Sequence, residues 1–439
     1  MFILYSILLT LGFIVLLPRL LLDAKRNGKY VDGFRQRLGQ LPEFKTDNRP
    51  ILWLHCVSVG ETNAARPIVK RILEEFPDYR LVISTTTKTG QNLAREMFAE
   101  HADLIFYFPF DWKFSVRRAL HIIKPNIVLI METELWFNFL HEAGRSGARI
   151  FIINGRLSEK SFKRYLMVRK MMIRVFHYVT LALMQDAEGA KRISGLGIRS
   201  SKVKVTGSVK FDQIVEESEN SLTKEFKRRF AISSDEPLIA AASTHAPEEA
   251  IILNAFKEIW KKSEGKLPRL LIAPRHPERF NEVAELIKNS GFDWTRRSEE
   301  ESGRDESAEV ILFDSVGELR AVFPLTEIVF VGGSLIPHGG QNVLEPAIAK
   351  KPIITGFYTM NFAEIVKEFL AQNALVQLPE LGENEAAAQL AAAFSELLQN
   401  AERRKELSEN AFAIIEKNRG ATEKTLEFLR PYLLVNRKL

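Results

Sequence analysis

The stretch Ile51-Leu52-Trp53-Leu54-His55-Cys56-Val57-Ser58-Val59-Gly60-Glu61 leads from an apolar run into a helical pattern that continues to Phe76. An apolar run, a small polar turn and a helix are typical of the first strand–turn–helix unit of an α/β domain. Ligands of such domains bind outside the carboxyl ends of the strands. Glu61 therefore stands where a general base could act. A carboxylate at a helix start is also explained by its favourable interaction with the helix dipole.

Apolar runs alternate with helical patterns along most of the remaining chain. This alternation is typical of βαβ units, in which helices cover both faces of a parallel sheet. We therefore expect an α/β protein with two Rossmann-like domains that face a cleft. Strands are expected at 51–56, 81–85, 104–108, 127–131, 150–153, 179–184, 203–206, 238–242, 270–273, 310–313, 328–331 and 353–354. The expected segments are the domains 50–212 and 237–420, a polar linker at 213–236, and a C-terminal helix and tail at 421–439.

The N-terminus is almost wholly apolar from Phe2 to Leu17 and again from Leu20 to Leu22. No basic residue precedes this segment and no small-residue cleavage site follows it, which argues against a cleaved signal peptide. Basic residues come afterwards, so the positive-inside rule leaves the body of the protein cytoplasmic. We expect residues 1–22 to be a membrane anchor and 23–49 a basic juxtamembrane segment, although an amphipathic or buried helix would also fit.

A second candidate for membrane contact is Ser158–Val179, where basic and apolar residues interleave in the pattern of an amphipathic helix. An ordinary surface helix with one buried face explains this pattern as well as a helix that rests on anionic lipid does.

The composition excludes some classes of protein. With 439 residues, a net charge of +6 and a single cysteine, Cys56, the chain has no intramolecular disulfide and no Cys-rich metal site. The eight histidines lack metal-ligand spacing. No Walker A, GxGxxG, HExxH or GxSxG motif occurs in its proper context, which disfavours kinases, dehydrogenases and metallohydrolases. The mild positive charge permits an anionic partner but does not require one.

Polar residues follow several expected strands of the first domain. Glu132 and Glu134 come directly after the apolar run Ile127–Met131. A carboxylate that ends a buried strand is costly unless it is paired or functional. Glu134 is expected to begin the next helix, where it would favour the dipole. Asn154-Gly155-Arg156 and Lys210 could bring cations to the same edge.

The second domain has a comparable group. Arg275 follows an apolar strand and suits bidentate recognition of phosphate. Ser315–Glu318, Gly332–Ser334 and Gly339–Pro346 offer small or glycine-rich turns before expected helices, where backbone N–H groups can bind an anion. Each glycine is also explained by a tight turn. The residues together favour a transferase that moves a group from a nucleotide donor to a lipid-linked acceptor.

The chain resembles the 3-deoxy-D-manno-octulosonic acid (Kdo) transferases of lipopolysaccharide synthesis, from its N-terminus to about residue 431. The fold that this resemblance implies is the glycosyltransferase-B fold of two Rossmann domains. The motifs that carry it are Ser58-Val59-Gly60-Glu61, Met131-Glu132-Thr133-Glu134-Leu135-Trp136, Thr206-Gly207-Ser208-Val209-Lys210-Phe211-Asp212, Ser243-Thr244-His245, Pro274-Arg275-His276-Pro277-Glu278-Arg279, and Phe330-Val331-Gly332-Gly333-Ser334 with Gly340-Gln341-Asn342-Val343-Leu344-Glu345.

The resemblance also implies roles for individual residues. Glu61 would be the catalytic base, and Glu132 and Lys210 would assist at the transition state. The residues expected to hold CMP are Pro274, Arg275, Val316, Gly317, Glu318, Asn342, Val343, Leu344 and Glu345. The implied reaction is an inverting transfer of Kdo from CMP-Kdo to a lipid A precursor (lipid IVA), without a metal or other cofactor. The expected location is the cytoplasmic face of the bacterial inner membrane, with inner-membrane lipids as partners and no nucleic acid.

Two positions depart from the family pattern. Pro247 stands where the family commonly has glycine, and Gly155 replaces the more usual alanine. The alternatives are a membrane-associated glycosyltransferase with another nucleotide-sugar donor and a membrane-anchored nucleotide-binding scaffold. Since Glu61 lies at a helix start, we also expect the dipole to lower its pKa and keep it ionised.

Overall fold

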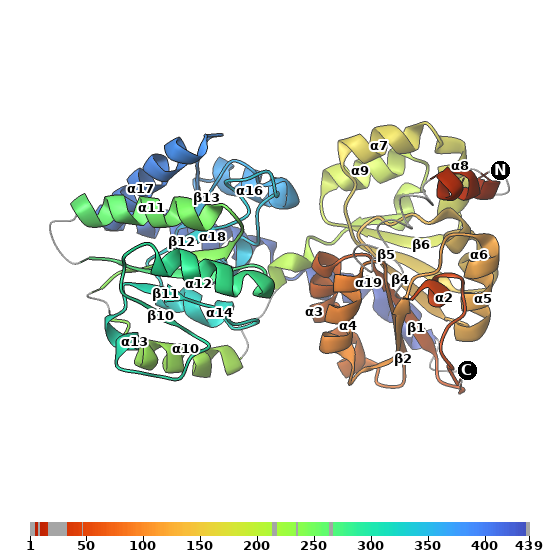
Figure 1. The fold of residues 1–439 in the computed structure, drawn as a ribbon. Helices are drawn as coiled ribbons and strands as arrows, with labels where there is room; N and C mark the ends of the chain where they lie inside the picture. Colours follow the sequence, from red (N-terminus) through yellow and green to blue (C-terminus); the bar gives the residue numbers. More distant parts are fainter. Residues whose placement is uncertain are drawn as a thin grey trace. The chain divides into compact units, whose positions relative to one another are not determined.

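The computed structural model describes residues 5–7, 9–15, 33–45, 47–212, 217–233, 236–262 and 267–435. These residues form two compact units, one built from the chain up to about residue 213 together with the segment after 418, and the other from about 214 to 417 (Figure 1). The two parallel-sheet α/β units confirm the expected fold class. The cleft expected between them stays a prediction.

The first unit is a seven-stranded, all-parallel sheet in the order β3-β2-β1-β4-β5-β6-β7. The chain runs outward from β1 to β3 and then returns to place β4 on the other side of β1, so the switch point lies between β1 and β4. The strands are β1 (Ile51–Cys56), β2 (Arg80–Thr85), β3 (Ala102–Tyr107), β4 (Ile127–Met131), β5 (Arg149–Gly155), β6 (Val179–Met184) and β7 (Val203–Val205).

Helices cover both faces of this sheet. Side chains alternate between the two faces along each strand, so Trp53 and Val128 join one core cluster, whereas Leu52 and Leu129 join the other. The helices of the first unit are α2 (Phe34–Arg37), α3 (Val59–Glu75), α4 (Lys88–Phe98), α5 (Lys113–Ile123), α6 (Phe137–Arg145), α7 (Glu159–Leu166), α8 (Arg169–Phe176), α9 (Ala187–Gly195) and α19 (Ala421–Val435), with the short turns η1 (Ser200–Lys202) and η2 (Val209–Asp212).

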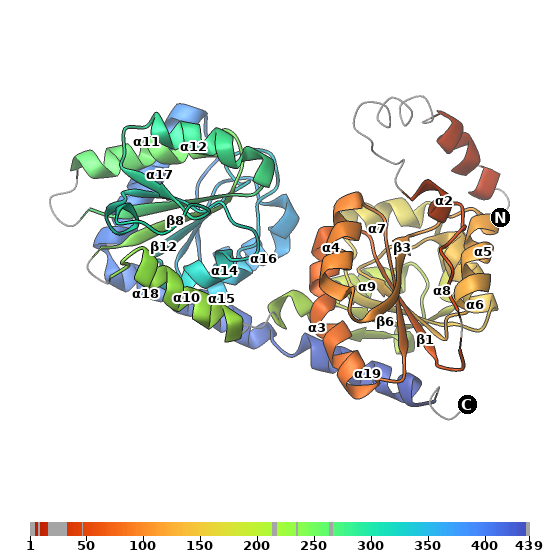
Figure 2. The same ribbon diagram turned by 60° about the horizontal axis from the view of Figure 1, so that its bottom comes forward.

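The last helix, α19, returns to the first unit and lies beside α3 (Figure 2). Its Leu426 and Leu429 are buried in the same core cluster as residues of β1 and α3. The Asp212 carboxylate accepts hydrogen bonds from the backbone N–H groups of Gly420 at 2.7 Å and Thr422 at 2.5 Å, and thereby holds the start of α19. The C-terminus therefore supports η2, the turn that carries Lys210.

The second unit has the strand order β10-β11-β9-β8-β12-β13-β14, also all parallel, with its switch point between β8 and β12. The strands are β8 (Leu238–Thr244), β9 (Arg269–Pro274), β10 (Trp294–Arg296), β11 (Val310–Leu312), β12 (Ile328–Val331), β13 (Ile353–Thr355) and β14 (Val376–Gln377). The helices are α10 (Glu217–Arg229), α11 (Glu248–Lys262), α12 (Phe280–Lys288), α13 (Arg304–Ser307), α14 (Leu319–Val322), α15 (Leu344–Ile348), α16 (Ala363–Ala371), α17 (Glu383–Gln399) and α18 (Ala401–Asn418), with the turns η3 (Pro277–Arg279), η4 (Phe323–Leu325) and η5 (Met360–Phe362).

The structure differs from the expected elements in several places, among them the short strands β10 and β14, which were not expected. The segment 213–236, expected as a linker, contains α10. Phe226 in this helix and Phe230 directly after it are buried, so their packing stabilises the helix. Ser158–Val179 forms the two helices α7 and α8 rather than one, with a break at 167–168. Glu134 does not begin a helix, since α6 starts at Phe137 after the N-cap Trp136.

The expected anchor, residues 1–22, falls partly outside the described residues. Residues 5–7 and 9–15 are helical, and among the residues that the structure describes no helix has the length and apolarity needed to cross a membrane. Residues 23–32 of the expected basic segment 23–49 also lie outside the described residues.

Candidate active site

Glu61 lies in the first turn of α3, just past the carboxyl end of β1, and only 6% of its surface is exposed. Its carboxylate accepts hydrogen bonds from the Val57 backbone N–H at 2.8 Å and from Ser58 Oγ at 3.1 Å. The turn between strand and helix therefore holds the side chain in place. Burial is the main cause that raises the pKa of the Glu61 carboxyl to about 8, and the charges of Glu132 and Glu134 act in the same direction.

The prediction that the helix dipole lowers the pKa of Glu61 is wrong. The pKa is raised instead, because the loss of solvation outweighs the hydrogen bonds from Val57 and Ser58, which act to lower it. At neutral pH most of the Glu61 carboxyl is protonated, and the ionised fraction is a stronger base than an ordinary carboxylate.

Glu132 follows β4, the strand beside β1 across the switch point. Its backbone is in the left-handed region, with φ at 54°, and its N–H donates to the Ile153 carbonyl at 3.0 Å. Lys210 Nζ lies 3.0 Å from Glu132 Oε1, and both side chains are largely buried, with exposed fractions of 19% and 24%. Two of the predicted catalytic residues, 78 positions apart, thus form an ion pair.

Asn154 positions this ion pair from the end of β5. It is buried, has φ at 51°, and its Oδ1 accepts a hydrogen bond from the Val209 backbone N–H at 3.2 Å. This bond holds η2 so that Lys210 reaches Glu132. Gly155 stands where the family more usually has alanine. The glycine leaves room for Met184, because a Cβ at this position would lie 2.6 Å from Met184 Sδ.

Glu134 belongs to the same edge of the sheet. Burial raises the pKa of its carboxyl, with a further contribution from Glu132. The loop that carries it is fixed by Thr133, whose Oγ1 donates to the Arg156 carbonyl at 2.6 Å and accepts from the Arg156 N–H at 3.0 Å. Three carboxylates and Lys210 therefore gather at one switch point, which is an arrangement suited to moving a proton.

In the second unit, Arg275 stands at the carboxyl end of β9 after the buried Pro274. Its backbone N–H donates to the Thr244 carbonyl at 3.0 Å, which fixes the turn. Its side chain is exposed and, among the described residues, no carboxylate binds its guanidinium. An exposed arginine without an acidic partner at this edge is available to a phosphate.

Arginines hold the acidic residues of the loops at Val316–Glu318 and Asn342–Glu345. Glu318 accepts from Arg297 Nε at 3.2 Å, and Glu345 accepts from Arg320 Nε at 3.0 Å. In the first loop, Gly317 has φ at 86° and Val316 is 72% exposed. In the second loop, Asn342 Oδ1 accepts a hydrogen bond from the Leu344 N–H at 3.0 Å, and Val343 and Leu344 are buried. Of this predicted set, Val343 and Leu344 offer a ligand only their backbone.

Glu248 is a functional candidate that the sequence reasoning missed. Its side chain is fully buried at the start of α11, and its carboxylate accepts hydrogen bonds from four backbone N–H groups, those of His245 at 3.0 Å, Gly333 at 2.6 Å, Ser334 at 2.9 Å and Leu335 at 2.9 Å. It thereby shapes the Gly-Gly-Ser turn across the switch point between β8 and β12.

Gly332 allows this close packing, because a Cβ there would lie 2.7 Å from the Ser243 carbonyl oxygen. The signal available in the sequence was the pair of acids that follows Pro247, Glu248 and Glu249, at the start of the helix after a strand.

Histidines also meet at this edge. The His245 ring lies 4.0 Å from the His338 ring and 5.2 Å from the His276 ring, centroid to centroid. Burial and the two neighbouring histidines lower the pKa of His245 to about 4, so it is neutral. Within the part of the chain that the structure describes, no group of three or more His, Cys, Asp or Glu side chains could hold a metal ion.

The two-domain parallel architecture is shared with nucleotide-sugar enzymes. UDP-GlcNAc 2-epimerase from Neisseria meningitidis, solved with UDP-GlcNAc, is 14% identical and superposes with a TM-score of 0.57, covering 87% of this chain and 100% of its own. At that identity the likeness concerns the fold. It places the chain in the class of two-Rossmann-domain, glycosyltransferase-B-like proteins.

Sequence comparison identifies the family. Residues 32–213 match the family model of 3-deoxy-D-manno-octulosonic-acid transferase (kdotransferase). The transferase of Haemophilus influenzae is 36% identical over 87% of each chain, and that of Chlamydia trachomatis serovar A is 29% identical over 97% of this chain and 96% of its own. The chain belongs to the Kdo transferase family, glycosyltransferases of lipopolysaccharide synthesis, as its motifs predicted.

Proposed function

We propose that the chain transfers Kdo from CMP-Kdo to a lipid A precursor such as lipid IVA, with Glu61 as the base that removes the proton from the acceptor hydroxyl. The observation that carries this assignment is the buried carboxylate at the switch point, with a pKa raised to about 8. A positioned base with a pKa near the working pH typically contributes ~10²–10⁴-fold to the rate.

The ion pair of Glu132 and Lys210 supports a second role, stabilisation of charge at the transition state. Both side chains are largely buried beside Glu61, so a charge that develops there is weakly screened. In this proposal the transfer inverts the anomeric centre and needs no metal, and Lys210 supplies positive charge beside Glu132.

The proposed donor site lies at the carboxyl edge of the second sheet. Arg275 binds the phosphate of CMP, and Pro274, Val316–Glu318 and Asn342–Glu345 surround the nucleotide. This assignment is supported by the exposed guanidinium and by the arginine-linked carboxylates Glu318 and Glu345.

We also propose that the N-terminal segment attaches the enzyme to the cytoplasmic face of the inner membrane. Tyr5 donates to Asp111 at 2.9 Å and Phe13 packs on Trp112, which joins one face of the described helix to the first unit. The other face is apolar and exposed. Its residues are Ile7, Leu11, Ile14 and Val15.

A second exposed apolar group lies at the junction of α7 and α8. It consists of Leu166, Met167, Val168 and Ile173, between basic residues of both helices. The variant Leu11→Glu/Ile14→Glu changes exposed positions only, so it should fold and leave the membrane fraction. Unchanged membrane association of this variant would contradict the attachment.

The test of the reaction is an incubation of the purified chain, in detergent, with tetraacylated lipid A precursor and one of two donors, CMP-Kdo or UDP-GlcNAc. We expect release of CMP and a lipid heavier by Kdo, and no reaction with UDP-GlcNAc. Transfer from the UDP-sugar would favour the alternative donor, and binding of CMP-Kdo without transfer would favour the scaffold.

A further inference from the structure

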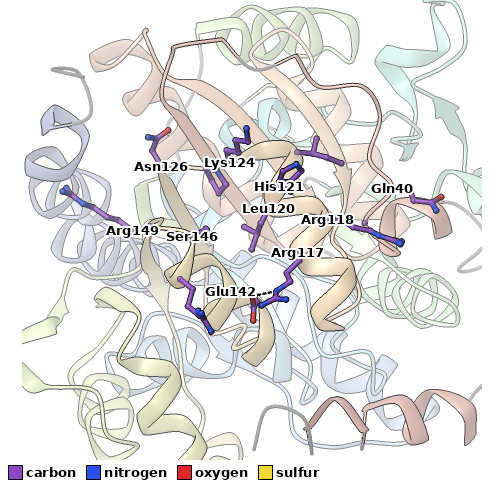
Figure 3. A pocket seen from close by; sticks show the side chains of 15 residues that line it. Gln40, Arg117, Arg118, Leu120, His121, Lys124, Asn126, Glu142, Ser146 and Arg149 are labelled. Carbon is purple, nitrogen blue, oxygen red and sulfur yellow. Dashed lines mark hydrogen bonds and ion pairs between the residues drawn. The ribbon is translucent and has the colours of Figure 1, made fainter.

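A basic hollow lies on the first unit between the C-terminal halves of α5 and α6 (Figure 3). It reaches the amino ends of β4 and β5, since Asn126 precedes the first of these strands and Arg149 begins the second. Glu61 follows the carboxyl end of β1, which is parallel to both. The hollow is therefore at the opposite edge of the sheet from the candidate active site.

Basic side chains dominate its walls. One group comes from α5 and the residue after it, and the other from the end of α6 and the start of β5. They are Arg117, Arg118, His121, Lys124, Arg145 and Arg149. The acid in the lining, Glu142, is already bound by Arg117 Nε at 2.6 Å and lies 3.6 Å from Lys113 Nζ. Among the described residues, no carboxylate pairs with Arg118, Lys124 or Arg145.

Cations at helix C-termini offset the helix dipole, and α5 and α6 both end here. That effect accounts for only part of the charge. Arg117, Arg118, Lys124, Arg145 and Arg149 carry five positive charges, Glu142 removes one, and two helix ends remove roughly one more. An excess of about three positive charges remains in a hollow of about 1140 Å³. Two of these cations also lie over aromatic rings, Arg118 at 5.6 Å from the Phe114 centroid and Arg149 at 5.3 Å from the Tyr432 centroid, which leaves their charge in place. An anion in the hollow would offset the excess.

The chemistry of the walls favours phosphate. Arginine presents a planar set of N–H donors that matches phosphate oxygens, and four of the five cations are arginines. The volume is slightly above the ~300–1,000 Å³ of typical small-ligand sites, so a lipid headgroup fits within it.

The neighbourhood of the hollow indicates the source of that phosphate. An adjoining hollow of about 550 Å³ shares Arg117 and is lined by Ser6 and Thr10 of the N-terminal helix. That helix presents the exposed apolar residues Ile7, Leu11, Ile14 and Val15 to its surroundings. The basic hollow is thus next to the segment proposed to enter the lipid.

We propose that the basic hollow binds the phosphate headgroup of an anionic membrane lipid. This inference rests on the proposed membrane attachment and adds a specific lipid site to it. The hollow would hold the first unit in one orientation on the membrane, apart from the residues that perform the transfer.

The test uses the double variant Arg118→Gln/Arg145→Gln. Both side chains are exposed, and neither pairs with Glu142, whose partner Arg117 is left intact. The matched control is Lys70→Gln/Arg95→Gln, which removes two exposed cations from α3 and α4, outside the hollow. Full-length protein is sedimented with vesicles of phosphatidylcholine alone or with one quarter phosphatidylglycerol, at low and high salt.

We expect phosphatidylglycerol to strengthen the binding of wild type and control. The double variant should lose about 30-fold of this added affinity, because each of the two cations contributes roughly 1 kcal/mol. Equal losses in the variant and the control, or no loss in the variant, would overturn the proposal. In a second arm, calorimetry with pyrophosphate should show weak binding. A lipid occupant would be contradicted if pyrophosphate bound tightly to the wild type and not to the variant, while phosphatidylglycerol had no effect on vesicle binding. Transfer in detergent should be equal in all three proteins, so failure of the lipid site leaves the transferase function untouched.

Discussion

Replacing Glu61 by glutamine should make the protein more stable at neutral pH. The pKa of Glu61 is raised from its usual 4.5 to about 8 on folding, so the folded chain binds this proton more tightly than the unfolded chain does. Wild-type stability therefore falls as pH rises from about 4.5 to 8. With 1.36 kcal/mol per pKa unit, the cost reaches roughly 3 kcal/mol at pH 7 and roughly 0.8 kcal/mol at pH 5.

Glutamine removes this cost, and its oxygen can still accept from the Val57 N–H, but its NH₂ can only donate to Ser58 Oγ, an exchange for which we allow about 1 kcal/mol. The variant should then be more stable than wild type by about 2 kcal/mol at pH 7 and about equal to it at pH 5. Urea unfolding of both proteins, followed by circular dichroism at pH 5, 6, 7 and 8, measures the difference. A glutamine variant that is less stable than wild type at pH 7, or a stability difference that does not change with pH, would refute a buried Glu61 carboxyl with a raised pKa.

Three further outcomes follow from the site. Arg275→Ala should weaken CMP-Kdo binding by roughly 10–100-fold, because a charged hydrogen bond to phosphate is worth about 1.5–3 kcal/mol, and calorimetry that finds wild-type affinity would remove the phosphate role. Glu248→Gln sets an NH₂ against backbone N–H groups and should raise the KM for CMP-Kdo about tenfold while the KM for the acceptor stays unchanged, with the exposed Glu278→Gln as control; equal changes in both KM values would point to general misfolding. The wild-type kcat/KM should increase with pH up to about 8 and then level off, and a rate already constant from pH 5 would mean a base of ordinary pKa.

The sequence predicted twelve of the fourteen strands that the structure describes, because parallel strands are buried on both faces and form continuous apolar runs, but it missed the short strands β10 and β14. Ile127–Met131, for example, matches β4 in full. The linker at 213–236 was misjudged because α10 has few apolar residues, and its helix depends on contacts of Phe226 with Phe313 that lie far apart in sequence.

The sequence located the candidate residues at strand ends, but it did not predict the pKa of the Glu61 carboxyl. The pKa of Glu61 depends on how completely the turn buries it and on Glu132 from another strand, and neither is visible in a local pattern. Glu248 was missed for the same reason, since its hydrogen-bond donors Gly333–Leu335 are 85 to 87 positions away.

The most direct test of the central claim, that Glu61 is the base of Kdo transfer, is to measure transfer and donor binding on the same preparation of Glu61→Gln. The variant is incubated in detergent with CMP-Kdo and tetraacylated lipid A precursor, and the mass of the lipid product is measured by mass spectrometry. The affinity for CMP is measured by calorimetry. We expect wild-type affinity for CMP and a rate reduced by ~10²–10⁴-fold. Transfer at the wild-type rate by this variant would contradict the assignment.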